Sequence, residues 1–179
     1  MLNRFQGDSG RRLRIDAFKN QKLVAGDAKL AEILADEAEL VHVPVGTSLI
    51  VQTEYTNDVY FILVGAFAIV VNGREIAIRG PREHVGEMGA IEPTQPRSAT
   101  VTAKEDSLVA KLSEEAFAKL ATQFPFLYKN IAQELSRRLL ERNSLVKPVH
   151  HKIRIFIISS AESLPIARLI HSVLNCTEN

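Results

Sequence analysis

The dipeptide Asn72-Gly73 separates two strand-like runs, Ala66 to Val71 and Arg74 to Arg79. A tight type I′ turn needs positive φ at both of its central residues, and asparagine and glycine adopt such values most easily. The dipeptide therefore predicts a β-hairpin, and with it a sheet whose neighbouring strands are antiparallel.

The hairpin lies inside a longer region, Ala38 to Leu112, in which short apolar runs alternate with turn residues. Many short strands with turns between them are typical of a small antiparallel barrel or roll. We expect an α+β fold, an antiparallel β-roll or jelly-roll flanked by helices. The strands are expected at Leu40 to Val45, Leu49 to Gln52, Tyr60 to Val64, Phe67 to Val71, Arg74 to Arg79, Ser98 to Ala103 and Ser107 to Leu112.

Helix signals flank this region on both sides. Residues 1–26 are expected to form a helical arm, with its helix between Arg11 and Val24. Asp27 and Ser113 each precede an apolar-periodic run, so each is expected to cap a helix with a side-chain oxygen. Residues 125–146 begin with a proline, which suits the first turn of a helix, and carry apolar residues near helical spacing. We expect one long helix there.

The stretch Gly86 to Val101 carries the most chemical information. A short helix-competent run follows Gly86, and the free N–H groups at a helix start form a seat for an anion. Two prolines then turn the chain, so that Arg97 and Ser98 return at the start of the next strand. Arginine offers phosphate a planar fork of donors, and serine adds a hydroxyl. Glu87 cannot serve the same anion, and a sugar hydroxyl beside a phosphate is its natural partner.

The order Gly-Glu-x-Gly, a proline-bearing loop and Arg-Ser-Ala-x-Val-x-Ala resembles the phosphate-binding cassette of the cyclic-nucleotide-binding domains. That family includes the bacterial catabolite activator protein and protein kinase A regulatory subunits. The resemblance covers roughly Leu30 to Val146 and implies one domain at residues 27–146. It implies that Glu87 and Gly86 hold the ribose, Glu87 by accepting from the 2′-hydroxyl. It implies that the cyclic phosphate is held by Met88, Gly89, Ala90, Arg97 and Ser98.

The same resemblance makes the long helix at about residues 125–146 a hinge helix that covers the nucleobase. In that register Arg142 and Asn143 fall near the base, although both could equally be solvent-facing. On the barrel side, the expected base contacts are Ile69, Ile76, Ala77 and Ala99.

The end of the chain has a different character. After an expected linker at residues 147–152, Ile153 to Ile158 reads as a buried strand, Ser159 to Ser163 as a polar turn and Leu164 to Leu174 as an amphipathic helix. Strand, serine-rich turn and helix are the opening of an α/β domain. The run resembles the first strand and helix of bacterial TIR-like domains, although Ile158 and Ser163 replace glycines and Ala161 replaces a serine.

TIR domains of this sort cleave NAD with a glutamate from a later helix. We expect residues 153–179 to be a truncated TIR-like segment without catalytic residues, so that NAD is a substrate only of the parent protein, an NAD+ nucleosidase. The order of the two domains resembles the Pycsar antiphage effectors. In these proteins a cyclic pyrimidine mononucleotide, cUMP or cCMP, switches on an attached TIR enzyme.

Composition limits the partners. A net charge of +1 gives no electrostatic reason to expect nucleic acid or an anionic membrane. The single cysteine, Cys176, permits no internal disulfide, and we expect a cytoplasmic protein. The resemblance implies a homodimer through the hinge helix, with a higher oligomer on activation. The expected ligand is a cyclic nucleotide, with no required cofactor and no metal.

Two alternatives remain. One is a cAMP- or cGMP-binding regulatory domain of a transcription regulator or kinase-like system, although a proline-bearing segment and a new strand stand where a helix-turn-helix would follow. The other is a cupin-like metal enzyme, which needs several converging histidines and a carboxylate. Only His42 and His84 fall in the β region, on separate segments, so the metal enzyme is strongly disfavoured.

Overall fold

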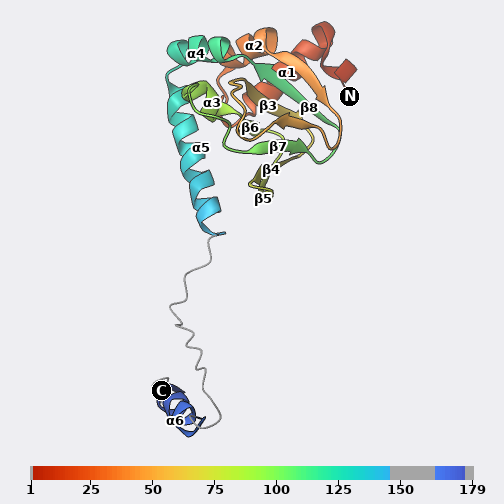
Figure 1. Cartoon of the computed structure of the whole chain (residues 1–179). Helices are drawn as coiled ribbons and strands as arrows, with labels where there is room; N and C mark the ends of the chain where they lie inside the picture. The colour runs from red at the N-terminus through yellow and green to blue at the C-terminus, as the bar shows by residue number, and fades with distance from the viewer. Residues whose placement is uncertain (1, 146–163, 176–179) are drawn as a thin grey trace. The chain divides into compact units, whose positions relative to one another are not determined.

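The computed structural model describes residues 2–145 and 164–175. The chain divides into two compact units, residues 1–146 and 147–179, which are described separately. Figure 1 shows the strands of the first unit beside its helices, with α5 running along one edge of the roll.

The strands of the first unit form two four-stranded antiparallel sheets, which confirms the expected α+β roll. The first sheet has the order β1 (Glu39–Val43), β8 (Ser107–Leu112), β3 (Val59–Val64), β6 (His84–Val85). The second has the order β2 (Ser48–Ile50), β7 (Thr100–Ala103), β4 (Phe67–Val71), β5 (Arg74–Arg79).

Two tight turns fix how β4 joins its neighbours. Asn72 and Gly73 have φ of 51° and 77°, and β4 pairs with β5, so the predicted hairpin is confirmed. Gly65, between β3 and β4, has φ of 94°, and a Cβ there would lie 2.0 Å from Ser107 Oγ. No larger side chain fits at that bend without displacing β8.

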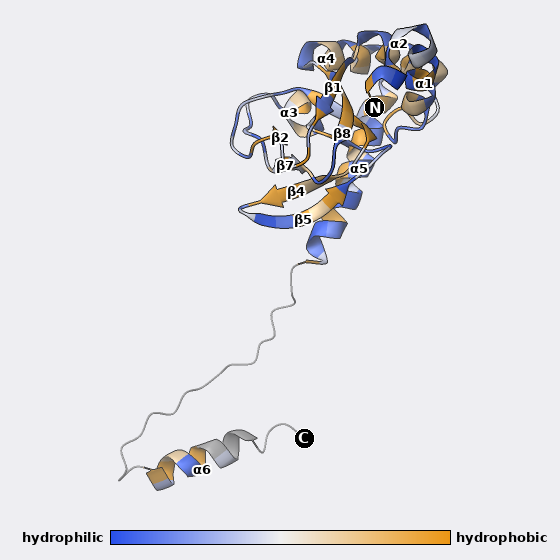
Figure 2. Ribbon diagram, turned by 90° about the vertical axis from the view of Figure 1, so that its right-hand side faces the viewer, coloured by the Kyte–Doolittle hydropathy of each residue, from blue (hydrophilic) through white to orange (hydrophobic). Residues whose placement is uncertain are grey.

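The apolar residues form two cores, and β3 contributes to both. Tyr60 and Ile62 pack between the two sheets, whereas Val59 and Phe61 pack toward the helices. A strand buried on both faces reads as a continuous apolar run, and Val59–Val64 does. Figure 2 shows β4 and β8 coloured largely as hydrophobic, whereas β5 includes a hydrophilic stretch.

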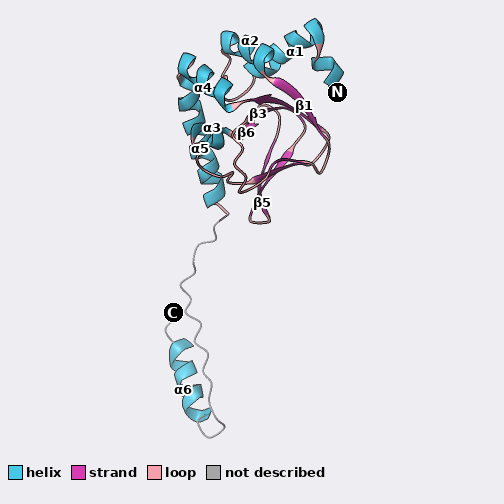
Figure 3. Cartoon of the chain, turned by 45° about the horizontal axis from the view of Figure 1, so that its top comes forward, coloured by secondary structure: helices cyan, strands magenta, loops and turns pink. Residues whose placement is uncertain are grey.

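The helices of this unit gather on one side of the strands (Figure 3). Two caps predicted from sequence are present: Asp27 accepts from the Leu30 amide and Ser113 from the Ala116 amide. The elements are the 3-10 turn η1 (Leu2–Phe5), α1 (Gly7–Lys19), α2 (Ala28–Glu37), α3 (Glu87–Ile91), α4 (Glu114–Gln123) and α5 (Phe126–Asn143).

Several boundary predictions were wrong. The first two strands end at Val43 and Ile50 rather than at Val45 and Gln52. The first helix spans Gly7–Lys19 rather than Arg11 to Val24, because the chain turns after Lys19 and the Gln21 side chain bonds to the Ile62 carbonyl of β3. The long helix ends at Asn143, short of Val146. The strand after the cassette begins at Thr100 rather than Ser98. The two-residue strand β6 was not predicted, because it is too short to show periodicity.

In the second unit the structure describes α6 (Leu164–Asn175), a helix predicted from sequence. The predicted linker at residues 147–152, the strand Ile153 to Ile158 and the turn Ser159 to Ser163 lie outside the described residues. Among the helices that the structure describes, none is long and apolar enough to cross a membrane.

Candidate functional site

A cavity of about 400 Å³ lies in the first unit, between α3, the hairpin β4–β5 and α5. That volume is in the range of small-molecule sites. Of the residues predicted as ligand contacts, Ala90 and Asn143 do not line the cavity. Those that do line it are Ile69, Ile76, Ala77, Gly86, Glu87, Met88, Gly89, Arg97, Ser98, Ala99 and Arg142.

Gly86 sets the direction in which the chain enters α3. It has φ of 90° and ψ of −4°, values in the left-handed region that favours glycine. A Cβ at this position would lie 2.5 Å from the Asp58 carbonyl oxygen and 3.0 Å from Arg97 Nη1. Glycine is therefore required for the close approach of α3 to the neighbouring loop and to the guanidinium.

The Arg97 guanidinium is buried in the cavity wall, with the side chain fixed at three points. Nη1 donates to the Gly86 carbonyl at 2.7 Å, Nη2 to the Asp58 carbonyl at 2.8 Å and Nε to Thr56 Oγ1 at 2.9 Å. Burial lowers the pKa of Arg97, and the charges of Tyr60, Asp58 and Glu87 oppose that shift. Arginine remains protonated at neutral pH all the same. The site thus holds a fixed, buried cation.

Backbone pairing holds the same segment in place. The Arg97 amide donates to the Glu54 carbonyl at 2.8 Å, and the Thr53 amide donates to the Arg97 carbonyl at 2.9 Å. The loop before β3 therefore positions both the main chain and the side chain of Arg97. Ser98, one residue later, is exposed, and its hydroxyl contacts the Met88 sulfur at 3.7 Å.

Glu87 is a buried carboxylate, 3% exposed, paired with an arginine of α5. Arg138 Nη1 donates to Glu87 Oε1 at 2.6 Å, and Arg138 Nη2 donates to the His84 carbonyl at 2.7 Å. Within the described part of the chain, Glu87 Oε2 and Arg138 Nε have no hydrogen-bond partner. The pair therefore keeps one acceptor and one donor unused where α5 meets α3.

His84 lies behind this pair. Its Nε2 is 3.9 Å from Glu87 Oε2, too far for a hydrogen bond, and its side chain is fully buried. Burial holds the pKa of His84 well below its usual range, and the charges of Arg138, Lys22 and Arg79 lower it further. The imidazole is therefore neutral, and the contact with Glu87 is not an ion pair.

The far end of the cavity has a different lining. Ile69, Ile76 and Ala77 of the hairpin and Leu139 of α5 line the cavity there. Arg79, at the end of β5, donates from Nη2 to Glu141 Oε2 at 2.8 Å, which joins the hairpin to α5.

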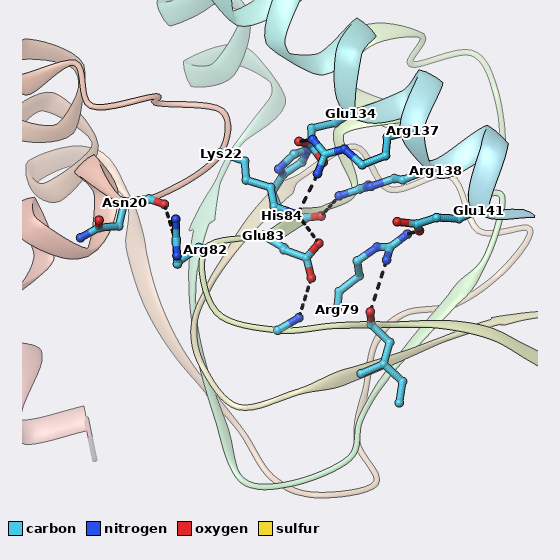
Figure 4. A network of polar contacts seen from close by, with 12 residues as sticks. Asn20, Lys22, Arg79, Arg82, Glu83, His84, Glu134, Arg137, Arg138 and Glu141 are labelled. Atoms are coloured by element: carbon cyan, nitrogen blue, oxygen red, sulfur yellow. Dashed lines mark hydrogen bonds and ion pairs between the residues drawn. The ribbon is translucent and has the colours of Figure 1, made fainter.

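A further network joins the segment after α1 to α5 (Figure 4). Lys22 Nζ lies 2.7 Å from Glu83 Oε1 and 3.8 Å from Glu134 Oε2, and Glu134 also pairs with Arg137. Burial raises the pKa of Glu83, but the hydrogen bonds from Lys22 and the Gly80 amide outweigh it and lower the pKa. The position of α5 is thus tied to the N-terminal arm and to the cavity.

Several residues of this site were not predicted from the sequence. The sequence could have indicated Arg138 as a site residue, since it stands one helical turn before Arg142 and both flank the apolar stripe of α5. It gave no such indication for Arg79 and Glu141, because an arginine at a strand end and a glutamate on a helix surface are ordinary in a globular domain. Thr56 lies in a loop whose position depends on tertiary packing. Among the described residues, no three His, Cys, Asp or Glu side chains cluster as a metal would require.

Comparison with known proteins gives matches to a protein family, to individual relatives and to solved structures. Residues 40–124 match the protein family described as "Cyclic nucleotide-binding domain". The chain is 51% identical over 173 residues to the Pycsar effector protein BcPycTIR of Burkholderia cepacia, covering 97% of the chain and 57% of that protein. It is 46% identical over 170 residues to the Pycsar effector protein XpPycTIR of Xanthomonas perforans, covering 95% and 56%. The chain thus spans a little over half the length of these relatives.

A solved structure with the same fold is that of cAMP-bound PfPKA-R, with a TM-score of 0.68 and 17% sequence identity. The match covers 75% of this chain and 47% of that one. At this identity the match establishes the fold of the roll and its helices, and nothing about the ligand.

Proposed function

Because the chain contains a domain of the cyclic nucleotide-binding family and its relatives include Pycsar effectors, we propose that it is the receptor module of such an effector. In this proposal it senses cUMP or cCMP and activates an attached TIR domain that cleaves NAD in antiphage defence. Coupling requires only that the ligand favours one position of α5 over another.

The observation that carries the proposal is the placement of Arg97 and Glu87 on one cavity. Arg97 is a fixed buried cation with N–H donors left over after its three hydrogen bonds, since a guanidinium has five. Glu87 lines the same cavity, and a carboxylate can accept more hydrogen bonds than the one from Arg138. A cation and an unsaturated acceptor side by side suit a cyclic phosphate fused to a ribose. Met88, Gly89, Ala90 and Ser98 remain proposed phosphate contacts, and Gly86 a proposed ribose contact.

One proposed phosphate contact already has an internal partner. The Gly89 amide donates to the Gly86 carbonyl at 3.2 Å, the long end of the normal range. A phosphate oxygen would have to share or replace that hydrogen bond. The proposal therefore places more weight on Arg97 than on the amides of this short helix.

Titration calorimetry of the purified chain with cUMP, cCMP, cAMP and cGMP tests the proposal. We expect the tightest binding for one of the two pyrimidine ligands, and weaker binding of the corresponding linear 5′-monophosphate. Tightest binding of cAMP or cGMP would favour the alternative regulatory domain. Failure of all four ligands to bind would overturn the proposal.

For activation, we propose that α5 also carries a homodimer contact and that ligand binding promotes a higher oligomer. Leu140 of α5 is 70% exposed, and an exposed leucine on a helix is a candidate interface residue. Light scattering of the wild type and of Leu140→Lys tests the dimer, with Leu13→Lys on α1 as an exposed control. In a protein extended to the length of its relatives, cyclic-nucleotide-dependent loss of NAD tests the enzyme.

A further inference from the structure

Arg79 is an unusual wall residue for a cavity. Its side chain is 11% exposed, although it stands at the end of an edge strand. Among the described residues, its hydrogen bonds go to Glu141 and, at 3.3 Å, to the Ile78 carbonyl. A guanidinium has five N–H donors, so several remain unused at a largely buried site. Because Arg79 lines the cavity, these unused donors are available to an acceptor bound there.

The contact with Glu141 does not by itself account for this arrangement. The Glu141 side chain is 49% exposed, and ion pairs with a partner in solvent contribute little to stability. If the ion pair served only to join β5 to α5 at the surface, the arginine would be exposed to solvent as well. Here the guanidinium lines the cavity and only the carboxylate is about half exposed, so the arginine is available to a bound group.

The position of the pair along α5 shows which part of a ligand it would meet. Arg138, Glu141 and Arg142 lie on one face of the helix, three and four residues apart. Arg138 pairs with Glu87, the proposed ribose contact, and Glu141 lies most of a turn further along. On β5, Arg79 shares a face with Ala77, since side chains alternate along a strand. Arg79 and Glu141 therefore lie beyond the proposed ribose contact, on the side away from Arg97. The base of a bound nucleotide would lie on that side.

We infer that Arg79 and Glu141 together read the hydrogen-bonding edge of the nucleobase, and so set which base this receptor accepts. Arg79 donates to an acceptor on the base, and Glu141 accepts from a neighbouring N–H. Uracil presents O2, N3–H and O4 along this edge, whereas cytosine presents O2, N3 and the N4 amino group, so an acceptor with a neighbouring N–H lies at a different place on each base. A donor and an acceptor held at fixed positions therefore discriminate between the two bases by where this pair lies. The inference rests on the proposed function, because it needs a cyclic nucleotide in the cavity.

The test is titration calorimetry of the wild type, Arg79→Lys and Glu141→Gln with cUMP, cCMP, cAMP and cGMP. Lysine keeps the positive charge and the ion pair with Glu141 but loses the planar set of donors. The Arg79→Lys variant therefore separates recognition of the base from the structural link between β5 and α5. Glutamine keeps the size of Glu141 at an exposed position and adds a donor. We expect the ratio of the two tightest dissociation constants to change by roughly 5- to 150-fold, the range for one well-formed base contact.

The matched control is Lys104→Gln, which breaks the 3.1 Å ion pair between Lys104 and Glu75, a residue of the same strand as Arg79. That pair does not line the cavity as the structure describes it, so all four affinities should stay unchanged. Melting temperatures check that each variant folds. If the Arg79 and Glu141 variants lower the affinity for all four ligands equally, the pair only joins β5 to α5 and the inference fails. Unchanged ratios also overturn it. Failure of the wild type to bind any of the four would instead overturn the proposed function, and this inference with it.

Discussion

The two ends of the cavity are built on different principles. At the cassette end, Arg97 and Glu87 are 5% and 3% exposed and are held by backbone carbonyls and a buried ion pair. At the hairpin end, apolar side chains and the Arg79–Glu141 pair form the wall, and Glu141 is half in solvent. A rigid, buried end suits the sugar-phosphate that all cyclic nucleotides share. A less constrained end suits the part in which they differ.

The largest expected effect is at the cassette end. Arg97→Ala should weaken binding of every cyclic nucleotide by about 2–3 kcal/mol, roughly 30–150-fold, because a charge-assisted contact to phosphate is lost. It should also lower the melting temperature, since the Gly86 and Asp58 carbonyls lose their donor. Titration calorimetry and thermal unfolding measure the two effects.

The control for that variant is Arg74→Ala, an exposed arginine on β5. It should leave affinity and melting temperature unchanged. If Arg97→Ala binds with wild-type affinity, Arg97 is not a phosphate contact. If it loses affinity for the cyclic nucleotides of one base alone, Arg97 recognises the base rather than the shared phosphate.

Glu87, the proposed ribose contact, should give the next largest effect. Glu87→Gln should reduce the penalty for 2′-deoxy ligands from roughly tenfold or more to a few-fold, because a hydrogen bond to a charged acceptor becomes one to a neutral acceptor. The ratio of ribose to deoxyribose affinities is the quantity to measure. That ratio is insensitive to any change in the Glu87–Arg138 pair that affects both ligands alike. An unchanged ratio would assign Glu87 a purely structural role.

Burial of the cassette end also predicts a response to acid. Burial and nearby positive charges lower the pKa of His84, so the unfolded chain takes up a proton there before the folded chain does. Below about pH 6.5, the usual pKa, the free energy of unfolding should fall, by up to about 1.4 kcal/mol per pH unit. Urea unfolding of the wild type and His84→Leu from pH 7.5 to 5 measures this. Equal pH slopes in the two proteins would contradict it.

The smallest effects are expected on the exposed face of α5. Arg142 lines the cavity but is exposed, so Arg142→Ala should change affinity by about fivefold or less. Asn143 does not line the cavity, and Asn143→Ala should have no effect. A larger loss for Asn143 than for Arg142 would mean that α5 takes another register when ligand is bound.

The same comparison explains what the sequence could predict. The roll, the Asn72-Gly73 hairpin and both side-chain caps follow from local rules, so the sequence predicts them correctly. Arg97 and Glu87 belong to a compact motif whose spacing carries the chemistry. Arg138, Arg79 and Glu141 meet their partners across 51 to 62 residues of chain, and that pairing depends on where α5 lies. No local pattern records it.

The central claim is that a cyclic sugar-phosphate occupies the cavity with its phosphate at Arg97 and its ribose at Glu87. A crystal structure of the chain with cUMP or cCMP tests it most directly. We expect a phosphate oxygen within hydrogen-bond distance of Arg97 and the 2′-hydroxyl within hydrogen-bond distance of the Glu87 carboxylate, with the base toward Arg79 and Glu141. A phosphate bound away from Arg97, or a ligand seated outside the cavity, would contradict the claim.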